Sequence, residues 1–178
     1  IEKAEIIWER GTNRSAFFRG EVDKYTWREI GSSFYPTELQ AAFLLAQLES
    51  FEKNQSMREK IWNHYYGSFG SIELDYSLRI LRPSIGTCQN FHMFAIILET
   101  SEEAEIVRQG LNDEGINAVI HYVPLHESKI GEEYSDGKGL EITSDLSGRL
   151  LRLPFHQGIS MEEIESASRK VREILSSR

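Results

Sequence analysis

Basic and aromatic side chains are concentrated in the segment 11–35, where they could bind an anionic ligand that carries a ring. The cationic residues of this segment are Arg14, Arg19, Lys24 and Arg28. Its larger aromatic residues are Phe17, Phe18, Tyr25, Trp27, Phe34 and Tyr35. Arginine and lysine neutralise phosphate charge and aromatic rings stack on flat groups, so the segment is typical of a binding loop for a nucleotide diphosphate. The alternative is a solvated loop whose aromatic side chains pack on a neighbouring domain.

Two histidines, His121 and His126, begin and end the motif HYVPLH at the end of a predicted strand. Imidazoles in such a place could act as acid–base groups or as hydrogen-bond donors to a substrate. Their spacing is not the i, i+4 spacing of a helical zinc pair, and cysteine does not lie nearby, so a metal site is not expected. Spacing alone favours the alternative that one histidine is packed and bonded to a backbone carbonyl.

Two serines, Ser32 and Ser33, precede a helix that Pro36 is predicted to open. Hydroxyl groups and free N–H groups ahead of a helix N-terminus bind phosphate. The alternative is ordinary capping of the helix by serine or threonine.

The composition describes a globular chain and excludes several classes of function. The 178 residues are 40% apolar and 27% charged, ordinary values that argue against disorder. The net charge of -8 repels phosphate backbones, so general nucleic-acid binding is not expected. Cys88 is the single cysteine, which is typical of a reducing compartment. The apolar stretches are too short to span a bilayer, so membrane insertion is not expected.

The elements that would position these residues begin with a helix over 1–10. This helix has no capping residue before it, which predicts that the chain starts inside a longer polypeptide. A second helix is predicted from Pro36 to Gly67 or Gly70. Since this is longer than the usual length of about 8–20 residues, it should kink near Asn54 or bridge two domains. Its predicted buried stripe consists of Leu39, Phe43, Ala46, Phe51, Ile61 and Trp62.

After residue 70 the pattern changes to short strands and amphipathic helices. The predicted extended segments are 72–81, 91–98, 117–122 and 150–153. The predicted helical segments are 101–114, 144–149 and 161–175, with a polar loop at 127–143. Ser101 and Ser160 are the predicted N-caps. This order predicts a small α+β layer in which two helices cover one sheet, so residues 1–35 would belong to a larger domain.

Five segments occur in an order that is found in a known enzyme family. They are EKAEIIWERGTNRSAFFRGEVDKYTW, IGSSFYPTELQAAFLLAQLE, NFHMFAIIL, GINAVIHYVPLH and RLLRLPFHQGIS. Together they resemble the C-terminal half of the DegT/StrS family of nucleotide-sugar aminotransferases, and within it the members that act on dTDP-linked 4-keto sugars. The resemblance implies that the chain forms part of an α/β PLP-transferase fold of type I. It implies the end of the large domain with the substrate loop at 1–35, an interdomain helix at 36–67 and a small α+β C-terminal domain at 68–178.

The resemblance also implies roles for residues of this chain. Cofactor binding is implied for Asn13, Arg19 and Ser33, and Ser33 stands where many members have an asparagine that reaches the PLP phosphate of the neighbouring subunit. Substrate binding is implied for Arg14, Phe18, Lys24, Tyr25, Trp27, His121, Tyr122 and His126. The resemblance implies no catalytic and no metal-binding residue in this chain, since the family's Schiff-base lysine lies upstream of the position of Ile1.

The implied activity is amino transfer, with glutamate as the expected donor, to a 4-keto-6-deoxy sugar nucleotide such as dTDP-4-keto-6-deoxyglucose. This reaction would serve the synthesis of lipopolysaccharide or another cell-surface polysaccharide. The implied enzyme is a cytoplasmic homodimer with shared active sites and pyridoxal 5'-phosphate (PLP) as cofactor, and the chain alone is expected to be inactive. Two alternatives stay open: a PLP-dependent sugar dehydratase, in which histidine replaces the lysine, and a non-catalytic ligand-binding or dimerisation module.

Overall fold

A computed structural model describes residues 1–136 and 139–177. The chain divides into two compact units, Ile1–Phe51 and Glu52–Arg178, and each is described by itself. Within the described residues, no helix is both long and apolar enough to cross a membrane.

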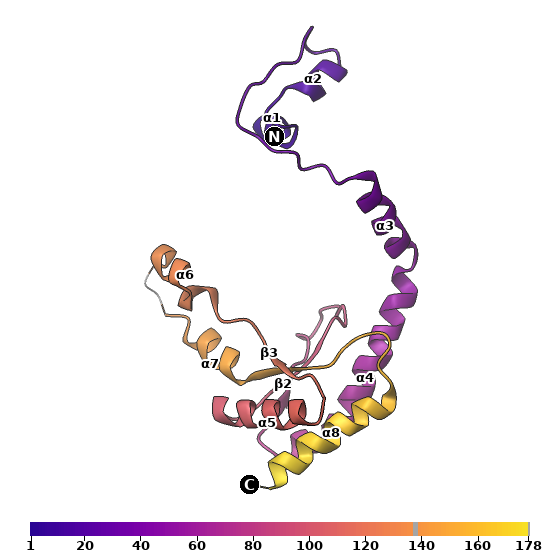
Figure 1. The fold of residues 1–178 in the computed structure, drawn as a ribbon, viewed down its shortest axis with the longest axis vertical. Helices are drawn as coiled ribbons and strands as arrows, with labels where there is room; N and C mark the ends of the chain where they lie inside the picture. The colour runs from indigo at the N-terminus through magenta and orange to yellow at the C-terminus, as the bar shows by residue number, and fades with distance from the viewer. Residues whose placement is uncertain (137–138, 178) are drawn as a thin grey trace. The chain divides into compact units, whose positions relative to one another are not determined.

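The first unit contains three helices (Figure 1): α1 (Glu2–Trp8), α2 (Arg14–Phe18) and α3 (Glu38–Glu49). The predicted first helix is confirmed, whereas α2 lies in a segment that the sequence predicts to be irregular. Thr37 is the N-cap of α3, because its side chain accepts a bond from the Gln40 backbone N–H while the Gln40 side chain accepts one from the Thr37 N–H. Pro36 therefore precedes the N-cap instead of opening the helix.

The apolar side chains of α3 are largely exposed. Leu39 is 84% exposed and Phe43 is 70% exposed, so the predicted buried stripe is wrong for this part of the chain. Within Ile1–Phe51, all of which is described, only Gly11 is buried. A helix that is apolar on several sides normally packs against other surfaces, and residues 1–51 do not supply them.

The predicted long helix is two helices. The break falls at Ser50, between α3 and α4 (Phe51–Asp75), and not near Asn54. Gly67 and Gly70, predicted to end the helix, lie inside α4. The helix continues because its later turns bury a set of large side chains, which are Ile61, Trp62, Tyr65, Phe69 and Ile72.

The second unit is built on a four-stranded antiparallel sheet in the order β1-β2-β4-β3. The strands are β1 (Arg79–Ile80), β2 (Phe94–Ile97), β3 (Val119–Ile120) and β4 (Leu150–Leu153). Each lies inside a predicted extended segment, although only the end of 72–81 is a strand. All residues of the central strand β2 are buried, and Phe94 pairs with Leu153 at one end of the ladder.

Helices α5 (Ser101–Asp113) and α8 (Met161–Ser176) lie side by side in Figure 1. Together with α4 they bury the core against the sheet. Ser160 caps α8 as predicted, but the N-cap of α5 is Thr100, which accepts a bond from the Glu103 backbone N–H, and not Ser101.

The predicted polar loop at 127–143 contains regular structure. It overlaps the 3₁₀ turn η1 (Leu125–Glu127), α6 (Lys129–Tyr134) and the start of α7 (Glu141–Arg149). Residues 137 and 138 of this segment lie outside the described residues.

Candidate functional site

The segment 11–35 forms a closed loop, and its base brings Asn13 into position. The Asn13 Oδ1 atom accepts a bond from the Thr26 backbone N–H at 2.7 Å, and Thr12 forms a bridge with Trp27. Residues 14–25 are therefore held at both ends. Asn13 has a structural acceptor role here, while its amide NH₂ group is left for other partners.

Two glycines allow the chain to close at this base. Gly11 has φ +80°, and its carbonyl accepts bonds from Arg28 at 2.7 Å and Glu29 at 3.0 Å. A Cβ atom at Gly11 would lie 1.7 Å from the Glu29 carbonyl oxygen, and one at Gly31 would lie 2.2 Å from the Gly11 nitrogen. Only glycine fits at either position, so this pair determines the path of the loop.

Arg19 has partners other than the predicted cofactor. Its guanidinium donates to Glu5 Oε1 at 2.7 Å and to Glu21 Oε1 at 2.8 Å, with a second bond to each carboxylate. The bond from Arg19 lowers the pKa of both glutamates. Because both edges of the guanidinium fork are occupied, we withdraw the expectation that Arg19 holds the PLP phosphate.

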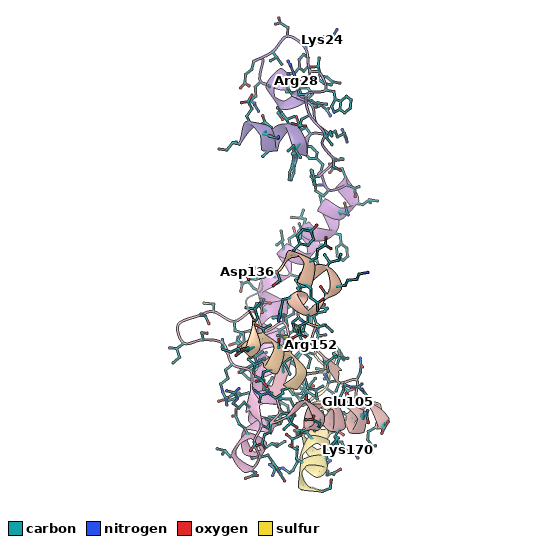
Figure 2. The ribbon with its side chains drawn as sticks, turned by 90° about the vertical axis from the view of Figure 1, so that its left-hand side faces the viewer. Lys24, Arg28, Glu105, Asp136, Arg152 and Lys170 are labelled. Atoms are coloured by element: carbon teal, nitrogen blue, oxygen red, sulfur yellow. The ribbon has the colours of Figure 1, made fainter. Side chains whose placement is uncertain are left out.

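The remaining loop cations lack a salt bridge with a described residue. Arg14 lies over the Phe18 ring at 5.1 Å, and Lys24 and Arg28 are exposed (Figure 2). None of these three forms an ion pair with a described residue. Three cations outside the ion pairs of the described residues lie on one loop, in a chain of net charge -8, and this favours an anionic ligand at this place.

Exposed aromatic rings accompany these cations. Phe18 and Trp27 are 67% and 76% exposed. Tyr25 packs edge-on against Phe17, with ring centroids 5.6 Å apart. Exposed rings beside free cations can stack on a nucleobase while the cations neutralise its phosphates.

Glu9 organises the base of this site, and sequence reasoning missed it. Its Oε2 atom accepts a bond from the Ser15 backbone N–H at 2.6 Å, and its Oε1 atom accepts one from the Tyr35 hydroxyl at 2.8 Å. Partial burial alone would raise the pKa of Glu9, but the bonds from Ser15 and Tyr35 outweigh it and lower that pKa. The hydrogen-bond partners of Glu9 lie six and 26 positions later in the chain, so no periodicity in the sequence indicates these contacts.

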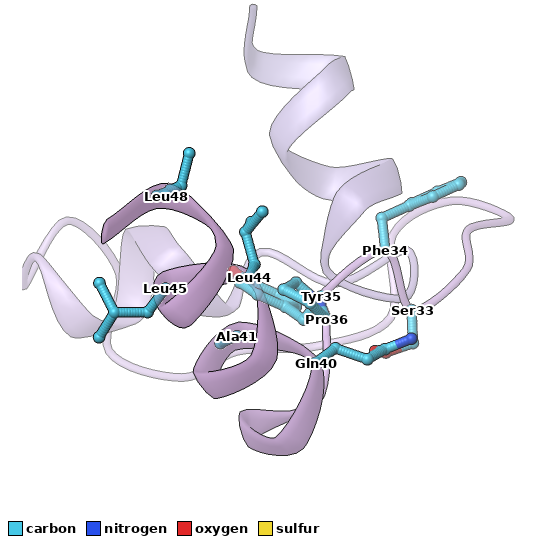
Figure 3. A pocket seen from close by; sticks show the side chains of 9 residues that line it. All are labelled: Ser33, Phe34, Tyr35, Pro36, Gln40, Ala41, Leu44, Leu45 and Leu48. Atoms are coloured by element: carbon cyan, nitrogen blue, oxygen red, sulfur yellow. The ribbon is translucent and has the colours of Figure 1, made fainter. Parts of the chain in front are cut away.

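Ser33 lies in a hollow ahead of α3 (Figure 3). It forms an isolated bridge with Glu9 and lines a hollow of about 710 Å³. The other lining residues are Phe34, Tyr35, Pro36, Gln40, Ala41, Leu44, Leu45 and Leu48. The Ser33 hydroxyl is exposed near a helix N-terminus, which suits a phosphate oxygen.

The motif HYVPLH lies in the second unit. The rings of His121 and Tyr122 are 5.0 Å apart, and the buried His121 Nδ1 atom has no hydrogen-bond partner among the described residues. His126 Nε2 lies 3.0 Å from Ser144 Oγ and 3.6 Å from Glu127 Oε1. The expectation that one histidine is bonded to a backbone carbonyl is not met by the described contacts, since the neighbours of His126 are side-chain oxygens. The loop residues and this motif belong to different compact units.

The described lysines are either exposed or paired with a carboxylate. A lysine that attaches a cofactor covalently is desolvated and has a lowered pKa. Lys170 instead donates to Glu114 at 2.7 Å, and this bond raises its pKa. The other described lysines are exposed: Lys3, Lys24, Lys53, Lys60 and Lys129. Lys138 lies outside the described residues.

The described residues include no group of three or more His, Cys, Asp or Glu side chains that could hold a metal ion. What they do offer is an exposed hydroxyl at Ser33 and exposed cations on the loop. Such groups suit the phosphates of a cofactor or a nucleotide. They do not supply a group that would react with the cofactor's carbon atom.

The family model of the DegT/DnrJ/EryC1/StrS aminotransferases matches residues 2–172. The chain belongs to this family, as its resemblance predicted. Pyridoxal phosphate is the cofactor of the family.

Curated relatives are about twice as long as this chain. It is 23% identical over 172 residues to UDP-4-amino-4,6-dideoxy-N-acetyl-beta-L-altrosamine transaminase of Helicobacter pylori, covering 96% of this chain and 44% of the relative. It is 27% identical over 157 residues to GDP-perosamine synthase of Escherichia coli O157:H7, covering 85% of this chain and 41% of the relative. The chain thus spans less than half the length of these relatives.

The fold agrees with a solved aminotransferase. The chain matches Helicobacter pylori PseC, an aminotransferase involved in the biosynthesis of pseudoaminic acid, with a TM-score of 0.81 and 21% identity. The match covers 99% of this chain and 46% of that chain. The predicted fold class, part of the PLP-transferase fold of type I, is confirmed.

Proposed function

We propose that this chain is the C-terminal part of a PLP-dependent aminotransferase that moves an amino group from glutamate to a 4-keto-6-deoxy sugar nucleotide, with dTDP-4-keto-6-deoxyglucose as the expected acceptor. One observation carries the proposal. In a chain that belongs to an aminotransferase family over residues 2–172, the loop 11–35 presents free cations among exposed rings.

The loop residues have separate tasks in this proposal. Arg14, Lys24 and Arg28 neutralise the diphosphate of the sugar nucleotide. The exposed rings of Phe18 and Trp27 stack on its base and exclude water from it. Tyr25 holds the loop through its edge-on contact with Phe17.

The cofactor supplies the chemistry of amino transfer when it is bound, as an electron sink for the reacting carbon. Ser33 donates a hydrogen bond to its phosphate in a shared dimeric active site, and the free Asn13 amide donates another. His121, Tyr122 and His126 line the substrate entrance. The covalent lysine would come from outside this chain, so the chain by itself would not transaminate.

The choice of nucleotide rests on the loop sequence. GTNRS, FFRG and DKYTW resemble the loop of dTDP-4-amino-4,6-dideoxygalactose transaminase, whereas the curated relatives are named for UDP- and GDP-linked sugars. We further propose a cytoplasmic homodimer that serves cell-surface polysaccharide synthesis.

A panel of acceptors tests the proposal. The complete gene product that contains this chain would be loaded with PLP and given glutamate with dTDP-, UDP- or GDP-linked 4-keto-6-deoxy sugars. We expect an amino sugar with the highest kcat/KM for the dTDP-linked acceptor. Loss of a sugar hydroxyl without amination would instead indicate a dehydratase, and nucleotide binding without turnover would indicate a binding module.

A further inference from the structure

Glu9 connects two parts of the loop to which separate ligands are assigned. Its Oε2 atom accepts the Ser15 backbone N–H at 2.6 Å near the start of α2, and its Oε1 atom accepts the Tyr35 hydroxyl at 2.8 Å ahead of α3. Arg14, which is assigned to the nucleotide diphosphate, directly precedes Ser15. Ser33, which is assigned to the cofactor phosphate, lies two residues before Tyr35. One carboxylate is therefore bonded to both ligand-binding segments.

Further contacts tie the turn 32–35 to the end of α1, where Glu9 lies. The backbone of Glu9 forms an isolated bridge with Ser33. The Tyr35 ring lies edge-on against Trp8, with ring centroids 5.4 Å apart and an angle of 80° between the planes. Since Tyr35 is held both at its ring and at its hydroxyl, a shift of the turn is transmitted to the Glu9 carboxylate.

The half-buried carboxylate of Glu9 is suited to such a link. The pKa of Glu9 lies below its ordinary value, so the group is ionised at neutral pH. Hydrogen bonds to a charged acceptor are roughly twice as strong as bonds between neutral groups. Because the two oxygens share one rigid plane, displacing the partner of one oxygen turns the other oxygen away from its own partner.

The segments that Glu9 joins are exposed, so a ligand would order them on binding. Phe18 in α2 is 67% exposed, and Tyr35 in the turn is 50% exposed. Ordering an exposed segment costs conformational entropy. If one ligand fixes its own segment, the link also orients the other segment, so the second ligand binds with a smaller loss of entropy.

We propose that Glu9 is a positioning residue that couples nucleotide binding at the loop to cofactor-phosphate binding at Ser33. This inference rests on the proposed function, from which the two ligand assignments come. The coupling is reciprocal, because each ligand must tighten the binding of the other by the same factor. It favours the binding of a sugar nucleotide to enzyme that already holds its cofactor.

A purely structural role for Glu9 predicts a different result. Loosening the loop without any coupling would weaken nucleotide binding by the same factor whether or not the cofactor is present. The ratio of the two dissociation constants for the nucleotide, without and with the cofactor, therefore separates coupling from loop stability.

Calorimetry on the complete gene product, freed of its cofactor, measures this ratio. The probe dTDP is titrated without and with saturating pyridoxamine 5'-phosphate, which carries the phosphate but no aldehyde to react with a lysine. In wild type we expect pyridoxamine 5'-phosphate to tighten dTDP binding about 5- to 10-fold, within the usual range of coupling between sites. Titrating the two ligands in the reverse order should give the same factor.

Tyr35→Phe keeps the ring contact with Trp8 and the bond from Ser15 to Glu9, so it tests the link with little change to the fold. Its coupling factor should fall below about twofold, because one of the two bonds at the Glu9 carboxylate is lost. Glu9→Met removes both bonds and should also abolish the coupling. Adding Tyr35→Phe to Glu9→Met should cause no further loss, since both changes act on one link.

The matched control is Glu21→Gln. Glu21 also accepts two side-chain bonds, but both come from Arg19 in the same segment of the loop. This variant should keep the coupling factor of wild type. Absence of coupling in wild type, wild-type coupling in Tyr35→Phe, or loss of coupling in Glu21→Gln would overturn the inference.

The coupling is measured from binding alone, so its failure can be told from failure of the proposed function. If no keto sugar is aminated but the coupling depends on Glu9 and Tyr35 as predicted, the proposed function fails and this inference stands. If the sugar is aminated while dTDP binds equally well with and without pyridoxamine 5'-phosphate, the proposed function stands and this inference fails.

Discussion

Tyr65 connects three parts of the core of the second unit. It is fully buried, stacks on Phe94 with ring centroids 4.7 Å apart, and donates a hydrogen bond from its hydroxyl to the Pro154 carbonyl at 2.6 Å. It thus joins α4 to the central strand and to the chain that follows β4. Burial raises the pKa of Tyr65 above its ordinary value.

Tyr65→Phe should lower the free energy of unfolding by about 1 kcal/mol at neutral pH, because it removes one buried hydrogen bond. The pH dependence has a definite sign. Since folding raises the pKa of Tyr65 above 10.0, its contribution is complete below that pH and is lost as the pH rises beyond it. Urea unfolding at neutral and alkaline pH measures both effects.

The control for this variant is Tyr66→Phe, at the exposed neighbouring position. It should leave the unfolding free energy nearly unchanged. If wild type and Tyr65→Phe lose stability equally above pH 10, the buried phenol is not the cause.

Residue types alone predicted a loop rich in cations. They did not predict which of these cations forms an ion pair. Arg14, Arg19 and Lys24 look alike in sequence. Only the fold brings Glu5 to Arg19 and leaves the other two free.

At the scale of elements, local patterns predicted the strands and the last helix well. β2 and β4 lie in short apolar runs, and Ser160 is the predicted N-cap of α8, where it forms a capping box with Glu163. The long helix was harder, because its passage through Gly67 and Gly70 depends on the tertiary packing of the later turns of α4. Nothing in the packing of α3 explains the break at Ser50.

The start of α5 offers a direct comparison between neighbouring residues. Thr100 Oγ1 accepts the Glu103 backbone N–H at 3.1 Å, so Thr100→Ala should cost about 1 kcal/mol of stability. Ser101→Ala should be close to neutral, since Ser101 is the first helical residue and not the cap. Chemical denaturation of both variants shows which residue is the N-cap of α5. A larger loss of stability in Ser101→Ala would identify Ser101 as the cap, as the sequence predicted.

Gly67 is exposed within α4, and a Cβ atom there would meet nothing within 4 Å. Gly67→Ala should therefore stabilise the second unit by about 0.5–1 kcal/mol, through helix propensity alone. A rise in thermal midpoint measures this gain. A loss of stability would mean that the helix does not continue through this position.

At the scale of the whole molecule, the two units differ in how much they bury. Ile1–Phe51 buries only Gly11 among its residues, whereas the second unit has a contiguous core. For the chain as given, amides of β2 should exchange with solvent much more slowly than those of α3, because protection follows buried apolar packing. Hydrogen exchange measured peptide by peptide checks this, and α3 amides as protected as those of β2 would be inconsistent with the exposed helix.

The central claim is that the enzyme containing this chain moves nitrogen onto a sugar. The most direct measurement gives the complete gene product PLP, nitrogen-labelled glutamate and dTDP-4-keto-6-deoxyglucose, and follows the label by mass spectrometry. We predict labelled nitrogen in the sugar nucleotide, and none when the 178-residue chain is used alone. A sugar product without the label, or turnover by the chain alone, would contradict the account.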